Sequence, residues 1–291
     1  MIMKHLWTAL LIFSAVLMTA TDASAQKPTF ANVPYVTGGG ERQQLDIYLP
    51  ANWQEAEKLP VLVWIHGGAW YAGSKDGLPG REFLAQGYAC VSINYRLSQQ
   101  AVFPAQIEDC KAAIRWLRAN AGTYHLDPEK IGVWGSSAGG HLAAMLGTTG
   151  HVKDFDVGEN LDQSSVVQAV CDFFGPADFF TFRATSQARA DKNSPEAKLI
   201  GGSIAEKPEL AALASPVTHV TKEASPFLIF HGTNDQTVPV NQGQGLYDAL
   251  KAAGADAEVR IVEGAGHNMG QFTTPEGKEA IARFFERCLK E

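Results

Sequence analysis

The sequence predicts an α/β fold in which helices cover both faces of a mostly parallel central sheet. Apolar segments rich in β-branched residues alternate with amphipathic segments, and several of the apolar segments run directly into Gly or Asp turns. The expected strands are residues 45–49, 61–65, 89–95, 131–134, 167–173, 227–230 and 257–262. The expected helices, in which apolar residues recur at helical spacing, are residues 105–119, 242–253 and 275–289.

Residues 177–220 depart from this alternation. They are rich in Ala, Ser, Thr and Pro and contain only short helical pieces. We expect a small insertion over one edge of the sheet, just before the strand at 227–230, where it covers the functional site. The stretch is too short for a second domain, and an α/β chain of 291 residues commonly folds as one unit. Residues 26–291 are therefore predicted to form a single domain.

The N-terminus has the parts of a secretory signal peptide. Lys4 lies in a short polar head, residues 6–18 form an apolar run, and Ala23-Ser24-Ala25 is a small-x-small cleavage signal. A membrane anchor is the alternative, but a bilayer requires roughly 20 apolar residues and this run is shorter. We expect cleavage after Ala25, which removes residues 1–25. The mature bacterial protein is then secreted or periplasmic, without stable membrane association.

Composition argues against several classes of function. A formal net charge of −7 and the lack of any Lys/Arg block in the sequence disfavour nucleic-acid binding. The sequence has no paired CxxC, H-E-x-x-H or carboxylate cluster and no G-x-G-x-x-G after an expected strand, so neither a metal nor a cofactor is expected. The cysteines lack short paired spacing and are expected to be free, buried thiols, although export leaves one disulfide bridge open. They are Cys90, Cys110, Cys171 and Cys288.

Gly135-Ser136-Ser137-Ala138-Gly139 matches the G-x-S-x-G pattern, between an expected strand and a helix of small residues at 140–146. A strand-turn-helix elbow exposes a serine hydroxyl, and glycine on each side permits the close approach that the turn requires. The helix N-terminus adds N–H groups and a positive dipole end beside the serine. We therefore predict that Ser137 is a catalytic nucleophile. The alternative is a Gly/Ser turn without chemistry.

A second motif, His66-Gly67-Gly68-Ala69-Trp70, directly follows the expected strand at 61–65. Two glycines let the backbone approach a substrate closely and direct N–H groups at a developing oxyanion, together with the residue after the nucleophile. We assign the oxyanion donors to the N–H groups of Gly68, Ala69 and Ala138. The alternative is a plain glycine turn in which His66 is a buried core residue.

The elbow pattern goes with the chain order Ser, Asp or Glu, His, so the acid and the base are expected later in the chain. The strand at 227–230 leads to Asp235, and the strand at 257–262 leads to His267. Both follow carboxyl ends of strands, where open α/β sheets place their ligand crevice. We expect His267 to take the proton of Ser137 and Asp235 to orient it. Asp178, after the strand at 167–173, is the rival for the acid.

With these residues the chain resembles the bacterial feruloyl and acetyl-xylan esterases of the α/β-hydrolase superfamily, and the likeness spans nearly all of residues 26–291. The resemblance rests on His66-Gly67-Gly68-Ala69-Trp70, Gly73-Ser74-Lys75-Asp76, Asn94-Tyr95-Arg96-Leu97, Phe103-Pro104-Ala105-Gln106, residues 131–141, Gly158-Glu159-Asn160-Leu161, Phe174-Gly175-Pro176-Ala177-Asp178 and Gly264-Ala265-Gly266-His267. It implies an α/β-hydrolase fold and a secreted enzyme that removes ester groups from xylan with Ser137, Asp235 and His267. Asn94 stands where many relatives carry Asp, at a position that looks structural.

These residues predict a serine carboxylesterase that works through an acyl-enzyme intermediate, acts on a small ester or a decorated polysaccharide, and uses no cofactor. Acetyl and feruloyl groups on xylan are the substrates that the resemblance implies. Arylformamidases and esterases for small esters share the same elbow and His-Gly-Gly loop and stay as alternatives. A hypothesis of another class is an inactive, carbohydrate-binding scaffold that keeps the fold.

Overall fold

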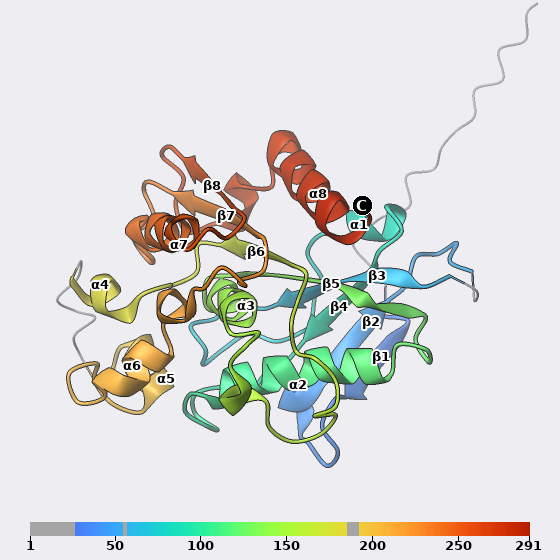
Figure 1. The fold of residues 1–291 in the computed structure, drawn as a ribbon, viewed down its shortest axis with the longest axis horizontal. Coiled ribbons are helices and arrows are strands. Elements are labelled where there is room, and N and C mark those ends of the chain that lie inside the picture. Colours follow the sequence, from blue (N-terminus) through green and yellow to red (C-terminus); the bar gives the residue numbers. More distant parts are fainter. Residues whose placement is uncertain (1–26, 55–56, 185–191) are drawn as a thin grey trace, which may run out of the picture.

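Figure 1 shows the computed structural model of the chain, which describes residues 27–54, 57–184 and 192–291. The predicted signal peptide at residues 1–25 lies outside the described residues. Within them, no helix has both the length and the apolar character that a membrane crossing requires. All four cysteines fall in the described part of the chain and are free there. Cys90, Cys110 and Cys171 are buried, as expected, whereas Cys288 is only partly buried.

The described strands form one eight-stranded sheet with the order β1-β2-β4-β3-β5-β6-β7-β8. Only β2 runs against the others, so the sheet is mostly parallel, which confirms the fold class predicted from the sequence. The strands are β1 (Phe30–Pro34), β2 (Gln44–Tyr48), β3 (Leu59–Ile65), β4 (Ala89–Ile93), β5 (Leu126–Ser136), β6 (Ala169–Phe173), β7 (Phe227–Gly232) and β8 (Ala257–Val262).

Helices cover both faces of this sheet (Figure 1). On one face lie α2 (Ala105–Ala119), α3 (Ala138–Thr148) and α7 (Asn241–Ala252), and on the other lie α1 (Glu82–Ala85) and α8 (Pro275–Leu289). The shorter helical segments are α4 (Phe179–Ala184), α5 (Pro195–Ile200), α6 (Pro208–Leu213), η2 (Glu41–Gln43), η3 (Lys153–Phe155), η5 (Pro216–His219) and η6 (Met269–Gln271).

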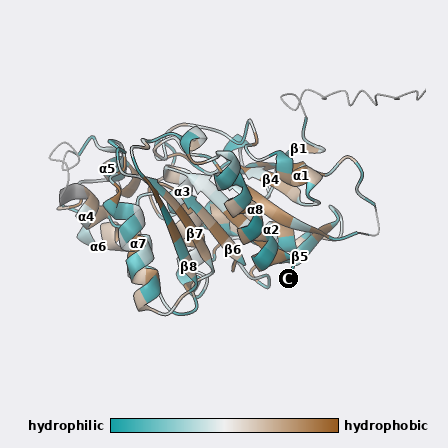
Figure 2. Ribbon diagram, turned by 90° about the horizontal axis from the view of Figure 1, so that it is seen from above, coloured by the Kyte–Doolittle hydropathy of each residue, from teal (hydrophilic) through white to brown (hydrophobic). Residues whose placement is uncertain are grey.

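The central strands are apolar on both faces because both faces are covered. In β3, Val61, Val63 and Ile65 face the core shared with α2, α3 and α7. The alternate residues Leu62 and Trp64 face the second core, shared with α1 and α8. Figure 2 shows the hydrophobic residues concentrated along the central strands. A strand buried on both sides reads as a continuous apolar run, which is why these strands were predicted well.

Two strand assignments differ from the prediction by more than two residues. The edge strand β1 was not expected, because its FANVP sequence is short and partly exposed and lacks a clear alternation of apolar and polar residues. Strand β5 begins at Leu126, which pairs with Leu59, although the prediction began at Ile131. The added stretch, residues 127–130, is polar and contains proline, so its sequence resembles a loop.

The chain between β6 and β7 carries α4, α5, α6 and η5, the short helical pieces that the sequence indicated. Residues 177–179 are tied to residues 215–217, because Val217 N donates to Ala177 O (3.2 Å) and Phe179 N donates to Ser215 Oγ (3.1 Å). These bonds close the segment near the end of β6, at the carboxyl edge of the parallel strands, where the candidate site lies. The chain then runs on to the opposite edge of the sheet, where β7 begins at Phe227.

Candidate active site

The nucleophile elbow forms where β5 ends and α3 begins. Ser137 has φ 56° and ψ −121°, a conformation that costs a non-glycine residue about 1–3 kcal/mol. Glycine on either side is required, since a Cβ at Gly135 would lie 2.4 Å from Gly139 O and a Cβ at Gly139 would lie 2.0 Å from Ile65 O. Ser137 N donates to Phe173 O (2.9 Å), which ties the turn to the end of β6.

His267 and Asp235 meet across two loops that follow β8 and β7. His267 Nδ1 donates to Asp235 Oδ2 at 2.7 Å. The other carboxylate oxygen, Oδ1, accepts the N–H groups of Thr237 and Val238, both at 2.8 Å. The Asp235 side chain is fully buried, whereas His267 is 21 % exposed. Burial raises the pKa of Asp235, but the hydrogen bonds from His267 and Val238 outweigh it and hold that pKa below its usual value.

The rival acid, Asp178, lies elsewhere. Its Oδ1 accepts the N–H of Phe180 at 2.9 Å, within the first turn of α4. Its own N–H donates to Gln242 Oε1 (2.9 Å), which also accepts from Ala177. Asp178 therefore starts a short helix, and the structure brings Asp235 to His267 instead.

His231 is a site residue that sequence reasoning missed. It ends β7, and its Nε2 donates to Val238 O (2.8 Å) while lying 3.8 Å from Asp235 Oδ2. Burial lowers the pKa of His231, so this histidine is neutral. In that form it supports the turn that holds Asp235. Gly243 leaves the space that the ring needs, since a Cβ there would lie 2.6 Å from Nδ1. The only signal in the sequence was a histidine at the end of a buried strand.

The His-Gly-Gly loop lies against the elbow. Gly68, Ala69 and Trp70 all have positive φ, at 114°, 52° and 59°. Gly68 must be glycine, because a Cβ there would lie 2.3 Å from Ala72 O. Its carbonyl accepts the N–H groups of Tyr71 and Ala72 and so points back into the loop. Such strained positions persist only where the surrounding structure holds them, and they cluster at functional sites.

Two buried histidines hold this loop in place. His66 stacks on Tyr95 with ring centroids 4.3 Å apart, and Tyr95 Oη donates to His66 O (3.0 Å). Trp70 Nε1 donates to His141 Nδ1 (3.1 Å), and His141 Nε2 donates to Ala214 O (2.7 Å). Burial lowers the pKa of both histidines to about 4, so they are neutral structural groups at neutral pH.

Two hollows meet at the elbow, and both are lined by Ser137 and Ala69. One measures about 510 Å³ and includes His267 and Gly68. The other measures about 340 Å³ and includes Ala138 but not His267. The structure therefore gathers around Ser137 every residue that the sequence assigned to the oxyanion donors, together with the predicted base. Among the described residues, no cluster of His, Cys, Asp and Glu is suited to a metal ion.

Asp172, also missed from the sequence, lies beneath the first turn of α3. Its Oδ1 accepts Gly175 N (2.9 Å), and a Cβ at Gly140 would lie 2.2 Å from that oxygen. Its Oδ2 is buried without a hydrogen-bond partner in the described part of the chain. Burial raises the pKa of Asp172 to about 7. The loop from Asp172 also carries Phe174, whose ring packs on His267 at 4.4 Å.

Comparisons with known proteins point to one family. A family model described as BD-FAE matches residues 45–250. A solved truncated carbohydrate esterase from gut microbiota has a TM-score of 0.85 and 36 % identity, over 93 % of this chain and 99 % of that one. A bifunctional GH43-CE protein of Bacteroides eggerthii has a TM-score of 0.77 and 39 % identity, over 88 % of this chain and 37 % of that one.

A mycobacterial relative is known from sequence. The probable carboxylic ester hydrolase LipM of Mycobacterium tuberculosis is 35 % identical over 73 % of this chain. This chain spans only 49 % of the length of that relative.

Asp172→Asn tests the buried acid through the pH dependence of stability. An unfolded aspartate titrates near pH 4. The native group titrates at about 7, so the folded state holds the extra proton between these values and loses stability as pH rises through that window. Asparagine does not titrate. We expect the melting temperature of Asp172→Asn, relative to the unsubstituted protein, to increase steadily from pH 4.5 to pH 7.5. Parallel melting curves across that range would contradict the assignment.

Proposed function

Because the chain belongs to the BD-FAE family, we propose that it is a carboxylic ester hydrolase with Ser137, His267 and Asp235 as its catalytic triad. The observation that carries this proposal is the 2.7 Å hydrogen bond from His267 Nδ1 to Asp235 Oδ2, beside a hollow that His267 shares with Ser137. With its hydrogen on Nδ1, the imidazole keeps Nε2 as a proton acceptor. The buried carboxylate stabilises the imidazolium that forms after proton transfer.

In the first half of the reaction, Ser137 Oγ attacks the ester carbonyl carbon while its proton passes to His267 Nε2. The negative charge that develops on the carbonyl oxygen is stabilised by the N–H groups of Gly68, Ala69 and Ala138. These donors lie in a strained loop and at the start of α3, so little reorganisation is needed when the charge forms. The intermediate then collapses, and His267 gives its proton to the departing alcohol.

In the second half, water replaces the alcohol beside His267. The neutral imidazole takes a proton from that water, and the resulting hydroxide attacks the acyl carbon of the Ser137 ester. The second tetrahedral intermediate uses the same oxyanion donors. It collapses with return of the proton to Ser137 Oγ, which releases the carboxylic acid and restores the enzyme.

The position of His267 assigns the two hollows to the two parts of the ester. The leaving oxygen must lie within reach of His267, so the 510 Å³ hollow that His267 lines receives the alcohol. The 340 Å³ hollow lacks His267 and receives the acyl group. Its walls include Trp70 from the His-Gly-Gly loop and Phe182 from the segment between β6 and β7. This segment therefore sets the acyl preference.

The acyl groups that we propose are acetyl and feruloyl groups on xylan. Most residues that line the acyl hollow are apolar, although Ser194, Glu196 and Thr237 also line it, and its volume leaves room for a group larger than acetyl. The structural neighbour described as a carbohydrate esterase supports a polysaccharide ester as substrate. Release of acetate and ferulate from decorated xylan, compared with small aryl esters and N-formylkynurenine, separates this substrate from the small-ester and arylformamidase alternatives.

We also propose that the protein acts outside the cytoplasm. The proposal rests on the Lys4 head, the apolar run at 6–18 and the Ala23-Ser24-Ala25 cleavage signal. The exported protein is expected to begin at Gln26 when its N-terminus is sequenced from the periplasm or the culture medium. An intact N-terminus that stays with the cells would contradict this expectation.

Paired substitutions test the triad. Ser137→Ala and Asp235→Asn are each expected to lower the kcat for a nitrophenyl ester by about four to six orders of magnitude. The melting temperature of Ser137→Ala should be nearly unchanged, whereas Asp235→Asn should also lower it at neutral pH, because a carboxylate with a lowered pKa stabilises the folded state. The matched controls, Ser136→Ala and Asp178→Asn, should keep most of the activity. A reversed order within either pair would move the nucleophile or the acid. If the unsubstituted protein were inert both to esters and to a serine-directed phosphonate, it would instead be a non-catalytic scaffold.

A further inference from the structure

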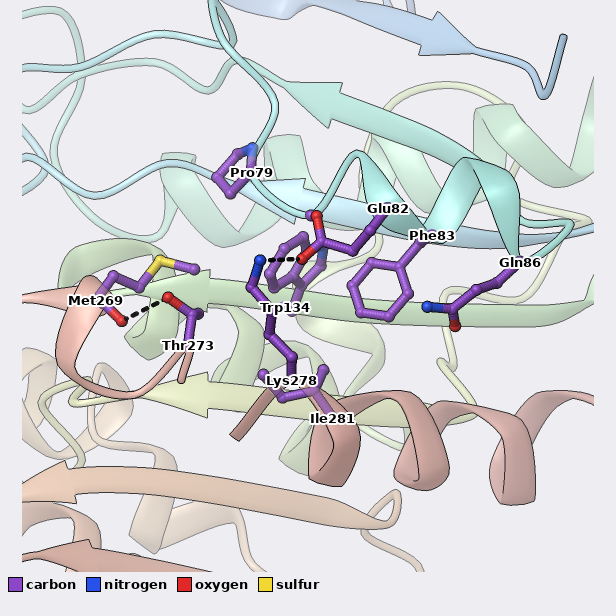
Figure 3. Close-up of a pocket in the computed structure, with 10 residues that line it drawn as sticks. Pro79, Glu82, Phe83, Gln86, Trp134, Met269, Thr273, Lys278 and Ile281 are labelled. Atoms are coloured by element: carbon purple, nitrogen blue, oxygen red, sulfur yellow. Dashed lines mark hydrogen bonds and ion pairs between the residues drawn. The ribbon is translucent and has the colours of Figure 1, made fainter. Parts of the chain in front are cut away.

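A second pocket adjoins the alcohol side of the site. It measures about 250 Å³ and lies between α1 and α8 (Figure 3). Met269, only two residues beyond His267, lines both this pocket and the hollow that contains His267 and Ser137. A hollow of about 700 Å³ also borders both, since it shares Gly67 with the hollow at His267 and Pro79 with the pocket between α1 and α8. The pocket between α1 and α8 therefore neighbours the hollow that His267 lines, and Met269 stands between the two.

The floor of this pocket is aromatic. Trp134 from β5 and Phe83 from α1 meet edge to face, with ring centroids 5.6 Å apart. Gly80 makes room for the indole, because a Cβ there would lie 2.4 Å from Trp134 Cη2. The Trp134 indole N–H is buried with no hydrogen-bond partner among the described residues. The floor is apolar, and because Trp134 and Phe83 are only 2 % and 3 % exposed, a bound ring would contact a small part of each.

The rim of the same pocket is polar and carries no net charge. Glu82 of α1 and Lys278 of α8 form an ion pair at 2.9 Å across it, and Gln86 lies at the end of α1 (Figure 3). Glu82 and Lys278 are 41 % and 53 % exposed, so both can also bind a ligand. An apolar floor beneath a rim of donors and acceptors suits a neutral sugar ring, whose C–H face is apolar and whose edge carries hydroxyl groups. An anionic ligand is not favoured, because the ammonium group of Lys278 is already paired with Glu82.

We propose that this pocket is a subsite for a neutral sugar ring of the leaving alcohol, away from the ring that bears the ester. The volume is below the roughly 300 Å³ at which pockets for drug-sized ligands begin, which fits one ring. The inference rests on the proposed function, because it takes the His267 side as the alcohol side. It identifies the preferred substrate as an esterified oligosaccharide or polysaccharide rather than a monosaccharide ester or an aryl ester.

Binding and turnover together test this subsite. Calorimetry with ester-free xylotetraose measures binding without turnover, and kcat/KM is measured on acetylated xylotetraose and on 4-nitrophenyl acetate. Glu82→Ala is the test variant. Glu279→Ala is its control, because Glu279 is also an exposed helix carboxylate in an ion pair, with Arg283 at 3.1 Å, but does not line the pocket.

Loss of the hydrogen bonds that Glu82 accepts is expected to weaken xylotetraose binding by about three- to tenfold. The kcat/KM on acetylated xylotetraose should fall by the same factor, while that on 4-nitrophenyl acetate stays constant and Glu279→Ala changes neither. Equal affinities in all three proteins, or no binding by the unsubstituted one, would overturn the subsite even if esters are hydrolysed. Conversely, if no ester is hydrolysed but xylotetraose binds and Glu82→Ala weakens it, the proposed function fails and the sugar site stands.

Discussion

The strained backbone at Ser137 is the constraint on which the site depends. A serine with φ 56° is held there because the ends of β3, β5 and β6 enclose the turn. Gly139 touches the carbonyl of Ile65 at the end of β3, and Phe173 at the end of β6 accepts the Ser137 N–H. The same packing brings the start of α3 to the His-Gly-Gly loop. The strain of the turn is thus offset by its contacts with the ends of the central strands.

The buried polar groups around this turn separate structural roles from chemical ones. His66 and His141 are held neutral by burial, and both fix the His-Gly-Gly loop. His66 stacks on Tyr95, and His141 accepts a hydrogen bond from Trp70. His267 differs from them because it is partly exposed and bonded to a buried carboxylate. In the proposed mechanism, His267 is therefore the imidazole that transfers the proton, while His66 and His141 shape the space around it.

Much of the fold and most of the candidate site could be predicted from the sequence. Strands buried on both faces and helices with one apolar face leave regular patterns, and the motifs around Ser137, Gly68 and His267 mark strand ends. Asp235 could not be separated from Asp178 with certainty, because that choice depends on which loop packs against His267 in three dimensions. The pocket between α1 and α8 could not be predicted from the sequence either. It is formed by residues far apart in the chain, and α1 is too short to show a periodic pattern.

The central claim is that the acyl group passes through a covalent bond to Ser137 Oγ. Rapid acid quenching during turnover of a slowly deacylated ester, followed by mass spectrometry of the peptide that spans β5 and α3, tests it most directly. We expect an acyl mass increment on Ser137 that forms in the pre-steady state and disappears as the substrate is consumed. An enzyme that turns over the ester without any increment on this peptide, or with the increment on Ser136, would contradict it.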